Sequence, residues 1–275
     1  MIKFAAICPH PPVIIPTIGR PSDFEKTAET IKTMKEIAGI FAKKNIETIV
    51  IISPHGPVEY QQITLNTSPA LLGNFEQFND YETYLNFEND LDITSLLKQE
   101  GESQKISVRS IEKSFLDHGA LVPLYYLIKN HVSKNGKKPK VVPIAYSYPD
   151  PKINFDFGKI IFNALKSQKK NIAVIASGDL SHRLNFDAPA GYAPEGAEFD
   201  KQLIQSLRSN NIKRILKINP ALIERAGECG YLSVVMLLGI IASYNQSKLL
   251  KKARFKALSY EGPFGVGYLV GYYPV

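Results

Sequence analysis

Short runs of almost entirely apolar residues, each about as long as one β-strand, recur along this chain between helical stretches. The run at residues 47–53, ETIVIIS, is the clearest, and comparable runs lie at residues 2–7, 140–146 and 171–177. A strand that is apolar on both of its faces has to be covered from both sides, as in parallel sheets. The alternation of such strands with helices therefore predicts an α/β fold whose mostly parallel sheet is covered on both faces.

The helices are predicted from apolar residues at helical spacing. Residues 22–44 should form one long helix with Ser22 as its N-cap. The polar stretch at residues 73–102 shows little periodicity, so we expect loops there. No linker or repeat interrupts the pattern, which predicts a single domain over residues 1–275. Further helices are expected at residues 118–131, 196–209 and 228–244, and a closing pair of strands at residues 252–259 and 265–272.

The composition is that of an ordinary globular protein. The hydrophobic fraction is 44% and the charged fraction 21% over 275 residues, so the chain can bury a large core without disulfides. Its two cysteines, Cys8 and Cys229, do not indicate a disulfide framework and fit a reducing compartment. The apolar N-terminal stretch is interrupted by Pro9, Pro11 and Pro12, which makes it a poor signal peptide. We therefore expect a cytoplasmic protein.

The chain is basic, with a formal net charge of +7 and a pI of about 9.1. A positive balance is compatible with nucleic acid, a membrane surface or anionic ligands as partners. Here the lysines are scattered as short pairs such as Lys43-Lys44 and Lys169-Lys170, and no nucleic-acid-binding motif accompanies them. No apolar run reaches the ~18–20 residues that a membrane span needs. We interpret the charge as a solubilising surface and expect neither nucleic acid nor a membrane as partner.

Two of the five histidines directly follow predicted strands. His10 lies in the sequence CPHPP after the first strand, and His55 lies in SPHGP after the strand at residues 47–53. The carboxyl ends of parallel strands are where α/β sheets bind ligands, and the neighbouring prolines hold the loop backbone in an extended shape. Two imidazoles at one sheet edge could share a metal or act in catalysis. A hydrogen-bonded structural histidine is the alternative at each position.

The other three histidines differ in their setting. Asp117 and His118 begin a predicted helix, where the carboxylate of Asp117 is suited to capping the helix N-terminus. His118 either faces the same site or has a structural role. His182 follows a further strand in the sequence SGDLSH, so its placement matches that of the two strand-end histidines. His131 lies near lysines at the polar end of a helix and is predicted to be a surface residue.

Glu228 stands in the sequence GECGY, just before the apolar stretch LSVVMLLGII. Its carboxylate could cap that helix, or it could be a metal ligand beside two histidines. Two histidines and one carboxylate with open positions form the ligand set of non-haem Fe(II) oxygenases. Cys229 is a rival ligand, and its alternative interpretation is a small buried hydrophobic residue. The residues themselves leave the third ligand open between these two.

Six motifs, taken in order, resemble those of the class III extradiol ring-cleavage dioxygenases, the LigB-like superfamily, which includes MEMO-like proteins and relatives from the AmmeMemoRadiSam system. They span almost the whole chain, and the ordered set is specific although no single motif is decisive. The resemblance implies a three-layer α/β/α fold with a central, mostly parallel or mixed sheet. The motifs are CPHPP (8–12), SPHGP (53–57), DHGALVPLYYL (117–127), ASGDLSHRL (176–184), GECGY (227–231) and SYEGPFGVGYLVG (259–271).

The resemblance also implies roles for individual residues. His10 and His55 match the two metal-ligating histidines of the superfamily, and Glu228 matches the ligating glutamate. His182 matches the histidine that acts as acid and base. His118 matches a second active-site histidine near the substrate and dioxygen.

The activity implied by the resemblance is an oxidoreductase reaction, the Fe(II)-dependent cleavage of a catechol-type ring with O2. In MEMO-like relatives, however, a cysteine followed by glycine occupies the metal site, and here Cys229 is followed by Gly230. The alternative is therefore a metal-binding protein without ring-cleaving activity, acting in partner recognition or in a modification pathway; a metal-dependent hydrolase is a weaker third. Fe(II) is the expected cofactor and zinc the other candidate. The expected partners are a small aromatic substrate, O2 and, by analogy with the superfamily, a second copy in a homodimer.

Overall fold

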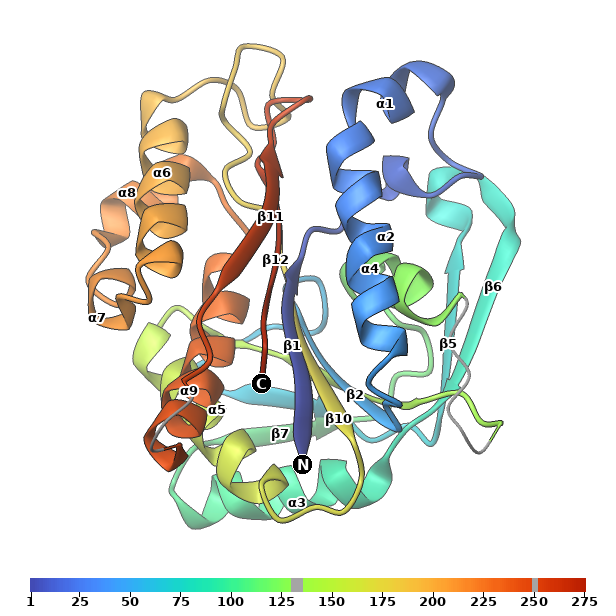
Figure 1. Cartoon of the computed structure of the whole chain (residues 1–275), viewed down its shortest axis with the longest axis vertical. Helices are drawn as coiled ribbons and strands as arrows, with labels where there is room; N and C mark the ends of the chain where they lie inside the picture. The colour runs from blue at the N-terminus through green and yellow to red at the C-terminus, as the bar shows by residue number, and fades with distance from the viewer. Residues whose placement is uncertain (130–135, 249–251) are drawn as a thin grey trace.

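A mixed eight-stranded sheet forms the centre of the computed structural model, which describes residues 1–129, 136–248 and 252–275. The strand order is β11-β12-β1-β10-β2-β8-β4-β7. Helices cover both faces of this sheet (Figure 1), so the predicted three-layer α/β/α fold is confirmed. The strands are β1 (Ile2–Cys8), β2 (Thr48–Ser53), β4 (Ile63–Asn66), β7 (Val108–Ile111), β8 (Lys140–Ala145), β10 (Ile172–Ser177), β11 (Lys256–Glu261) and β12 (Tyr268–Tyr273).

The four central strands run parallel, with β1 beside β10, β10 beside β2 and β2 beside β8. Antiparallel strands flank them, because β12 pairs with β1 and β4 pairs with β8. The parallel register aligns the carboxyl ends of the strands, since Cys8 lies opposite Ser177 and Ile52 lies opposite Ala176. Residues that follow β1, β10 and β2 therefore emerge side by side at one edge of the sheet.

Alternate residues of the central strands enter two separate apolar clusters. On β2, Val50 and Ile52 belong to one cluster, whereas Ile49 and Ile51 belong to the other. The helices of the first cluster include α3 (Leu91–Ser103), α5 (Pro151–Leu165), α6 (Pro194–Arg208) and α9 (Tyr231–Ser247). The second cluster contains residues of α2 (Ala28–Ala42), α4 (His118–Ile128), β5 (Ala70–Phe75) and β6 (Asp80–Glu88).

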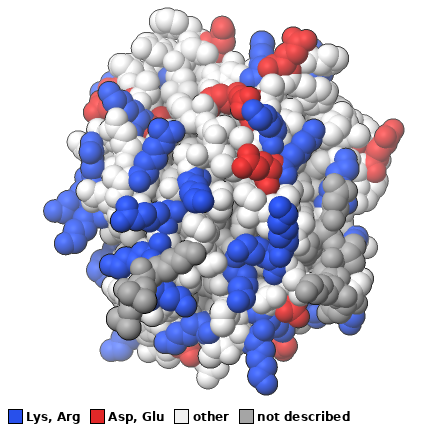
Figure 2. Space-filling view, viewed as in Figure 1, with Lys and Arg blue, Asp and Glu red and all other residues white. Residues whose placement is uncertain are grey.

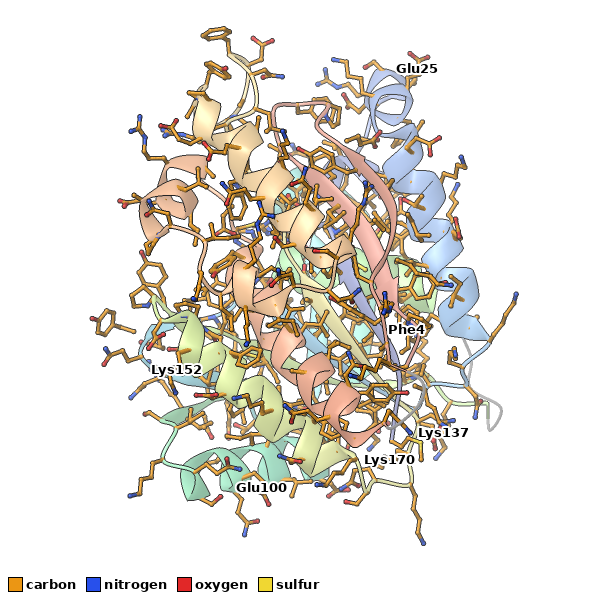
Figure 3. All side chains as sticks on the ribbon, turned by 60° about the vertical axis from the view of Figure 1, so that its left-hand side comes forward. Phe4, Glu25, Glu100, Lys137, Lys152 and Lys170 are labelled. Carbon is orange, nitrogen blue, oxygen red and sulfur yellow. The ribbon has the colours of Figure 1, made fainter. Side chains whose placement is uncertain are left out.

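Apolar side chains of the central strands are buried, and most charged side chains of the helices point into solvent. Phe4 of β1 lies within the molecule and is 1% exposed, while Lys152 and Glu100 project from the helices (Figure 3). Lysine and arginine side chains are spread over the face that carries β11 and α2 (Figure 2). Among the described residues, no helix is both long and apolar enough to cross a membrane. The shorter elements are η1 (Pro12–Ile14), α1 (Pro21–Lys26), β3 (Glu59–Tyr60), η2 (Glu76–Phe78), β9 (Ser147–Tyr148), α7 (Ile212–Ile215) and α8 (Pro220–Ala226).

The helix predicted at residues 22–44 is divided into α1 and α2, with Thr27 between them. The carboxylate of Glu261, from β11, accepts hydrogen bonds from the backbone N–H of Thr30 at 2.8 Å and from its hydroxyl at 2.5 Å. A side chain from a distant strand thus satisfies one of the N–H groups in the first turn of α2. This partner of the first turn of α2 lies far away in the sequence, so the local pattern does not indicate it.

The prediction of loops at residues 73–102 is wrong. Strands β5 and β6 form an antiparallel hairpin in this region, and α3 follows it. The hairpin packs only one face on the core, so Leu71 and Phe75 are buried while Leu72 and Tyr84 are exposed. The polar and exposed positions on the other face conceal the apolar pattern. Helix α5 was not predicted either.

Helix α4 begins at His118, as predicted, and its described part ends at Ile128. The predicted end of this helix at residue 131 lies outside the described residues. The same holds for His131 itself, so its expected surface position is not described.

Candidate metal centre

Three loops that follow strands β1, β2 and β10 meet at the carboxyl edge of the parallel sheet. His10 is the second residue after β1, and His55 is the second residue after β2. The loop after β10 carries His182, and the first turn of α4 brings His118 to the same place. These four histidines line one cleft of about 380 Å³, whose wall also includes Pro12, Asp179, Pro189 and Ala190.

His10 is held on several sides at once. Its side chain is almost completely buried, at 2% exposure. The backbone N–H of His10 donates to Oδ1 of Asp179 at 2.9 Å, and the ring Nδ1 lies 2.9 Å from Oγ of Ser177. Its other ring nitrogen, Nε2, lies 3.0 Å from Nε2 of His55. The imidazole of His10 is therefore fixed in position and orientation.

His55 and His118 form a stacked pair beside His10. Their ring centroids are 4.3 Å apart with an interplanar angle of 24°. His55 is exposed, whereas His118 is half-buried and meets the ring of Phe78 edge-on at 5.3 Å. Asp117 accepts a hydrogen bond from the backbone N–H of Ala120 at 3.0 Å, so the expected capping of α4 by Asp117 is confirmed.

The protein surroundings lower the pKa values of three histidines of this site, His10, His55 and His118. Burial lowers the pKa of His10 well below its usual value, and the neighbouring His55, His118 and His182 lower it further. Burial, followed by the proximity of His55, lowers the pKa of His118 to about 4. His55 has an exposed edge, but desolvation by the protein around the rest of its ring lowers its pKa as well. Neutral imidazole is the form that binds a metal, so a cation would not have to displace protons from these rings.

Cys229, rather than Glu228, has its side chain beside the two histidines. The Sγ atom of Cys229 lies 3.6 Å from Nε2 of His10. Among the residues that the structure describes, the ligand atoms of His10, His55 and Cys229 all lie within 4.8 Å of one another, which is close enough to hold one metal ion. Burial raises the pKa of the Cys229 thiol well above its usual value, so binding as thiolate requires a cation to displace the proton.

The carboxylate of Glu228 is turned toward helix α9. It accepts a hydrogen bond from the backbone N–H of Tyr231 at 2.5 Å, in the first turn of that helix. Burial raises the pKa of Glu228 to about 8. Glu228 thus makes the capping contact that the sequence offered as the alternative to metal binding.

The ring of His182 is oriented by a backbone carbonyl. Its Nδ1 forms a hydrogen bond with the carbonyl oxygen of Gly227. Because a carbonyl oxygen can only accept, Nδ1 carries a proton, and the neutral tautomer that fits this contact has its lone pair on Nε2. His182 can therefore accept a proton through Nε2.

Two residues of the site were missed in the sequence. Ser177 ends β10 and Asp179 follows it, so both obey the same strand-end rule that singled out His10 and His55. Asp179 is 5% exposed, and its backbone N–H donates to Sγ of Cys229 at 3.3 Å. Burial raises the pKa of the Asp179 carboxyl to about 7. The strand-end rule, applied to every residue after β10 rather than to histidine alone, would have found them.

The fold and the site together define an α/β protein with a cluster of potential metal ligands at the carboxyl edge of its sheet. The family model described as the catalytic LigB subunit of aromatic ring-opening dioxygenase matches residues 4–271 of the chain. The chain therefore belongs to the LigB family, as the order of its motifs predicted.

Individual relatives are similar to different extents. Protein CA_C1420 of Clostridium acetobutylicum is 35% identical over 271 residues, which are 95% of this chain, and the chain spans only 55% of the length of that protein. The 3,4-dihydroxyphenylacetate 2,3-dioxygenase of Escherichia coli is 25% identical over 228 residues, covering 75% of this chain and 78% of the enzyme. The MEMO1 family protein PF1638 of Pyrococcus furiosus is 34% identical over 84 residues, covering 30% of this chain and 28% of that protein.

Among solved structures, one example shows the same fold. The uncharacterized protein JW3007 from Escherichia coli K12 superposes with a TM-score of 0.65 and covers 98% of this chain and 99% of its own. The sequence identity is 14%, so this likeness shows the fold alone.

Proposed function

We propose that this protein is an Fe(II)-dependent extradiol dioxygenase that opens a catechol-type aromatic ring with O2. The observation that carries the proposal is the pair of neutral imidazoles, His10 and His55, whose Nε2 atoms lie 3.0 Å apart in a cleft lined by two more histidines. Membership of the LigB family supports it, as does the relative named 3,4-dihydroxyphenylacetate 2,3-dioxygenase. That name specifies an aromatic ring with two adjacent hydroxyl groups.

The residues present fit a divalent metal. We propose His10 and His55 as two ligands, because their Nε2 atoms lie 3.0 Å apart and the pKa of each ring is lowered, which favours the neutral form. The distances favour Cys229 as the third ligand, and Glu228 stays a competing prediction. Iron is proposed over zinc because activation of O2 needs a redox-active metal, which zinc is not. When bound, the metal would lower the pKa of a coordinated phenol and supply the redox chemistry.

Proton transfer, hydrogen bonding to the reacting oxygen and exclusion of water would be carried out by side chains of the protein. The free Nε2 of His182 accepts the proton of a substrate hydroxyl, since its Nδ1 proton is held by the carbonyl of Gly227. His118 is neutral at physiological pH and donates a hydrogen bond toward the oxygen that attacks the ring. Pro12 and Pro189 line the cleft with apolar surface, which limits the access of water to the reacting ring. One ring carbon–carbon bond beside the hydroxyls breaks, and both atoms of O2 enter the product.

The test combines metal analysis with oxygen uptake. Protein purified without oxygen is loaded with Fe(II), and oxygen consumption is followed with catechol, protocatechuate and 3,4-dihydroxyphenylacetate. About one iron per chain with consumption of O2 and appearance of a ring-opened product is expected. His182→Ala should keep its iron and lose turnover, whereas His55→Ala should lose the iron. Bound zinc, or iron without uptake across the panel, would instead support a metal-binding protein without ring-cleaving activity, and absence of any metal would refute the site.

A further inference from the structure

The hydroxyl of Ser177 lies between the ring of His10 and the first turn of α4. Ser177 is the last residue of β10 and is completely buried. Its Oγ donates a hydrogen bond to the carbonyl oxygen of Gly119 at 2.5 Å and lies 2.9 Å from Nδ1 of His10. The hydroxyl therefore joins three segments of the chain that are far apart in the sequence.

These hydrogen bonds determine which ring nitrogen of His10 carries the proton. The carbonyl of Gly119 can only accept, and the hydroxyl of Ser177 has a single proton, which it donates to that carbonyl. The Ser177 oxygen can then only accept from His10, so Nδ1 of His10 must carry the ring proton. In the neutral ring this leaves Nε2 without a proton, so its lone pair can accept a hydrogen bond or bind a metal. That atom is the one that lies 3.0 Å from Nε2 of His55 and 3.6 Å from Sγ of Cys229.

We propose that Ser177 is a positioning residue that locks His10 in the Nδ1–H tautomer and so presents its Nε2 lone pair to the metal. The inference rests on the metal site of the proposed function. A partner that fixes the tautomer and ring orientation of a ligating histidine is typically worth about 10–100-fold in metal affinity. Asp179 complements this effect, because it holds the backbone N–H of His10 while Ser177 holds the ring.

Gly119 makes the arrangement possible by letting α4 approach β2 and β10 closely. A Cβ atom at position 119 would lie 2.6 Å from Oγ of Ser53, 2.9 Å from Oδ1 of Asp117 and 3.1 Å from Cδ2 of His55. Any side chain there would push the first turn of α4 away, and its carbonyl would move off Ser177. The acceptor that orients the Ser177 hydroxyl thus depends on the absence of a side chain at this position.

Ser53 provides a matched control. It ends β2 as Ser177 ends β10, and it is also a buried serine. Its hydroxyl donates to Asp117, and its oxygen accepts from the backbone N–H of His55 at 3.3 Å. It has no described bond to a ring nitrogen. Ser53→Ala therefore removes a buried strand-end hydroxyl at the same edge without touching the tautomer of a ligand.

The experiment measures metal affinity and tautomer separately. Metal-free protein is titrated with Co(II), and the protonated ring nitrogen of His10 is identified by long-range proton–nitrogen correlation in protein labelled with ¹⁵N-histidine. We expect Nδ1–H for His10 in the wild type. Ser177→Ala should bind Co(II) about 10–100-fold more weakly and show Nε2–H at His10. Ser177→Thr and Ser53→Ala should both keep the Nδ1–H signal of His10. Thermal unfolding of each variant identifies any that fails to fold.

Two results would overturn the inference. One is Nε2–H at His10 in the wild type. The other is a Ser177→Ala protein that keeps both the wild-type Co(II) affinity and the Nδ1–H signal. The tautomer is read in metal-free protein, so it decides the role of Ser177 even if the wild type consumes no oxygen. A wild type that binds Co(II) and has the expected tautomer but no oxygenase activity would reject the proposed function and leave the role of Ser177 intact.

Discussion

His10 and His55 follow successive strands in similar Pro-His sequences, yet the protein supports them very differently. His10 is buried, and its backbone N–H and both ring nitrogens have partners. His55 is exposed, its ring rests on that of His118, and the described residues give its Nδ1 no hydrogen-bond partner. A repeated sequence motif thus produces one rigid imidazole and one adaptable imidazole. In the proposed metal site, His10 would fix the position of the metal and His55 would be the ligand that can adjust.

Removing each imidazole in turn should show the largest difference between the two histidines, in the stability of the metal-free protein. His10→Ala leaves a buried cavity and an unpaired acceptor at Ser177, so we expect the free energy of unfolding of the metal-free protein to fall by about 2–4 kcal/mol. His55→Ala, at an exposed position, should cost less than about 1 kcal/mol. Both variants should lose the metal. Urea denaturation in the presence of a chelator measures the difference, and equal losses for the two variants would contradict it.

The third ligand is tested by a pair of neighbouring substitutions. Cys229→Ala should weaken Co(II) binding by about 100-fold or more and remove the thiolate-to-cobalt absorption in the near ultraviolet. Glu228→Gln should change the affinity by less than about 3-fold, because the amide oxygen still accepts from the N–H of Tyr231. A Co(II) titration of both variants decides the matter. The reverse pattern would return the role to Glu228, as the sequence motif predicted.

Loss of the N-cap of α4 should make the positions of His55 and His118 less well fixed without removing a proposed ligand. Asp117→Ala deletes the acceptor for the N–H of Ala120 and for the hydroxyl of Ser53, and we expect a loss of about 1 kcal/mol in the free energy of unfolding. The stacked pair of His55 and His118 would be less well ordered, so Co(II) affinity should fall only a few-fold. If Asp117→Ala lowered the Co(II) affinity as much as Ser177→Ala does, the protein would support His10 and His55 equally. Denaturation and Co(II) titration on the same sample give both values.

The smallest effect concerns the choice of substrate. Although the chain carries a net charge of +7, the described residues that line the cleft include no lysine or arginine, and Asp179 is the acid among them. On the face drawn in Figure 2, lysine and arginine side chains are spread over the outer surface. We therefore expect kcat/KM for 4-methylcatechol to exceed that for protocatechuate by a few-fold, with little dependence on salt. Oxygen uptake at two ionic strengths tests this, and a strong preference for the carboxylated compound would show that a cation reaches the substrate.

The sequence predicted the parallel strands and the strand-end histidines for one physical reason. Strands such as β2 are buried on both faces, so their apolar runs are continuous and their ends are sharp. The hairpin of β5 and β6 has one exposed face, and its polar residues dilute that signal. The first turn of α2 is bonded to Glu261, which lies 231 residues further along the chain, so local patterns cannot indicate this contact.

The choice of the third ligand, too, could not be predicted from the sequence. Glu228 and Cys229 are adjacent in one turn, and no pattern in the sequence decides which of them faces His10. The answer depends on the N–H of Tyr231, which attracts the carboxylate, and on Asp179, whose backbone approaches the thiol. The contact with Tyr231 is local, three residues along the chain, whereas the contact with Asp179 exists only once the turn before α9 has packed beside β10. The chemistry of the site could therefore be predicted as a set of candidate residues, but the selection among them comes from the tertiary structure.

The site also ties together parts of the chain that are remote in the sequence. His10 and Cys229, whose ligand atoms lie 3.6 Å apart, are separated by 219 positions. An ion bound by both residues would act as a crosslink that closes most of the chain into a loop. The entropic contribution of loop closure to the free energy grows by only about 0.6 kcal/mol for each doubling of the loop length. A protease cut in any surface loop between them would leave the two fragments joined at the edge of the sheet. Resistance of the nicked protein to dissociation would then depend on the ion.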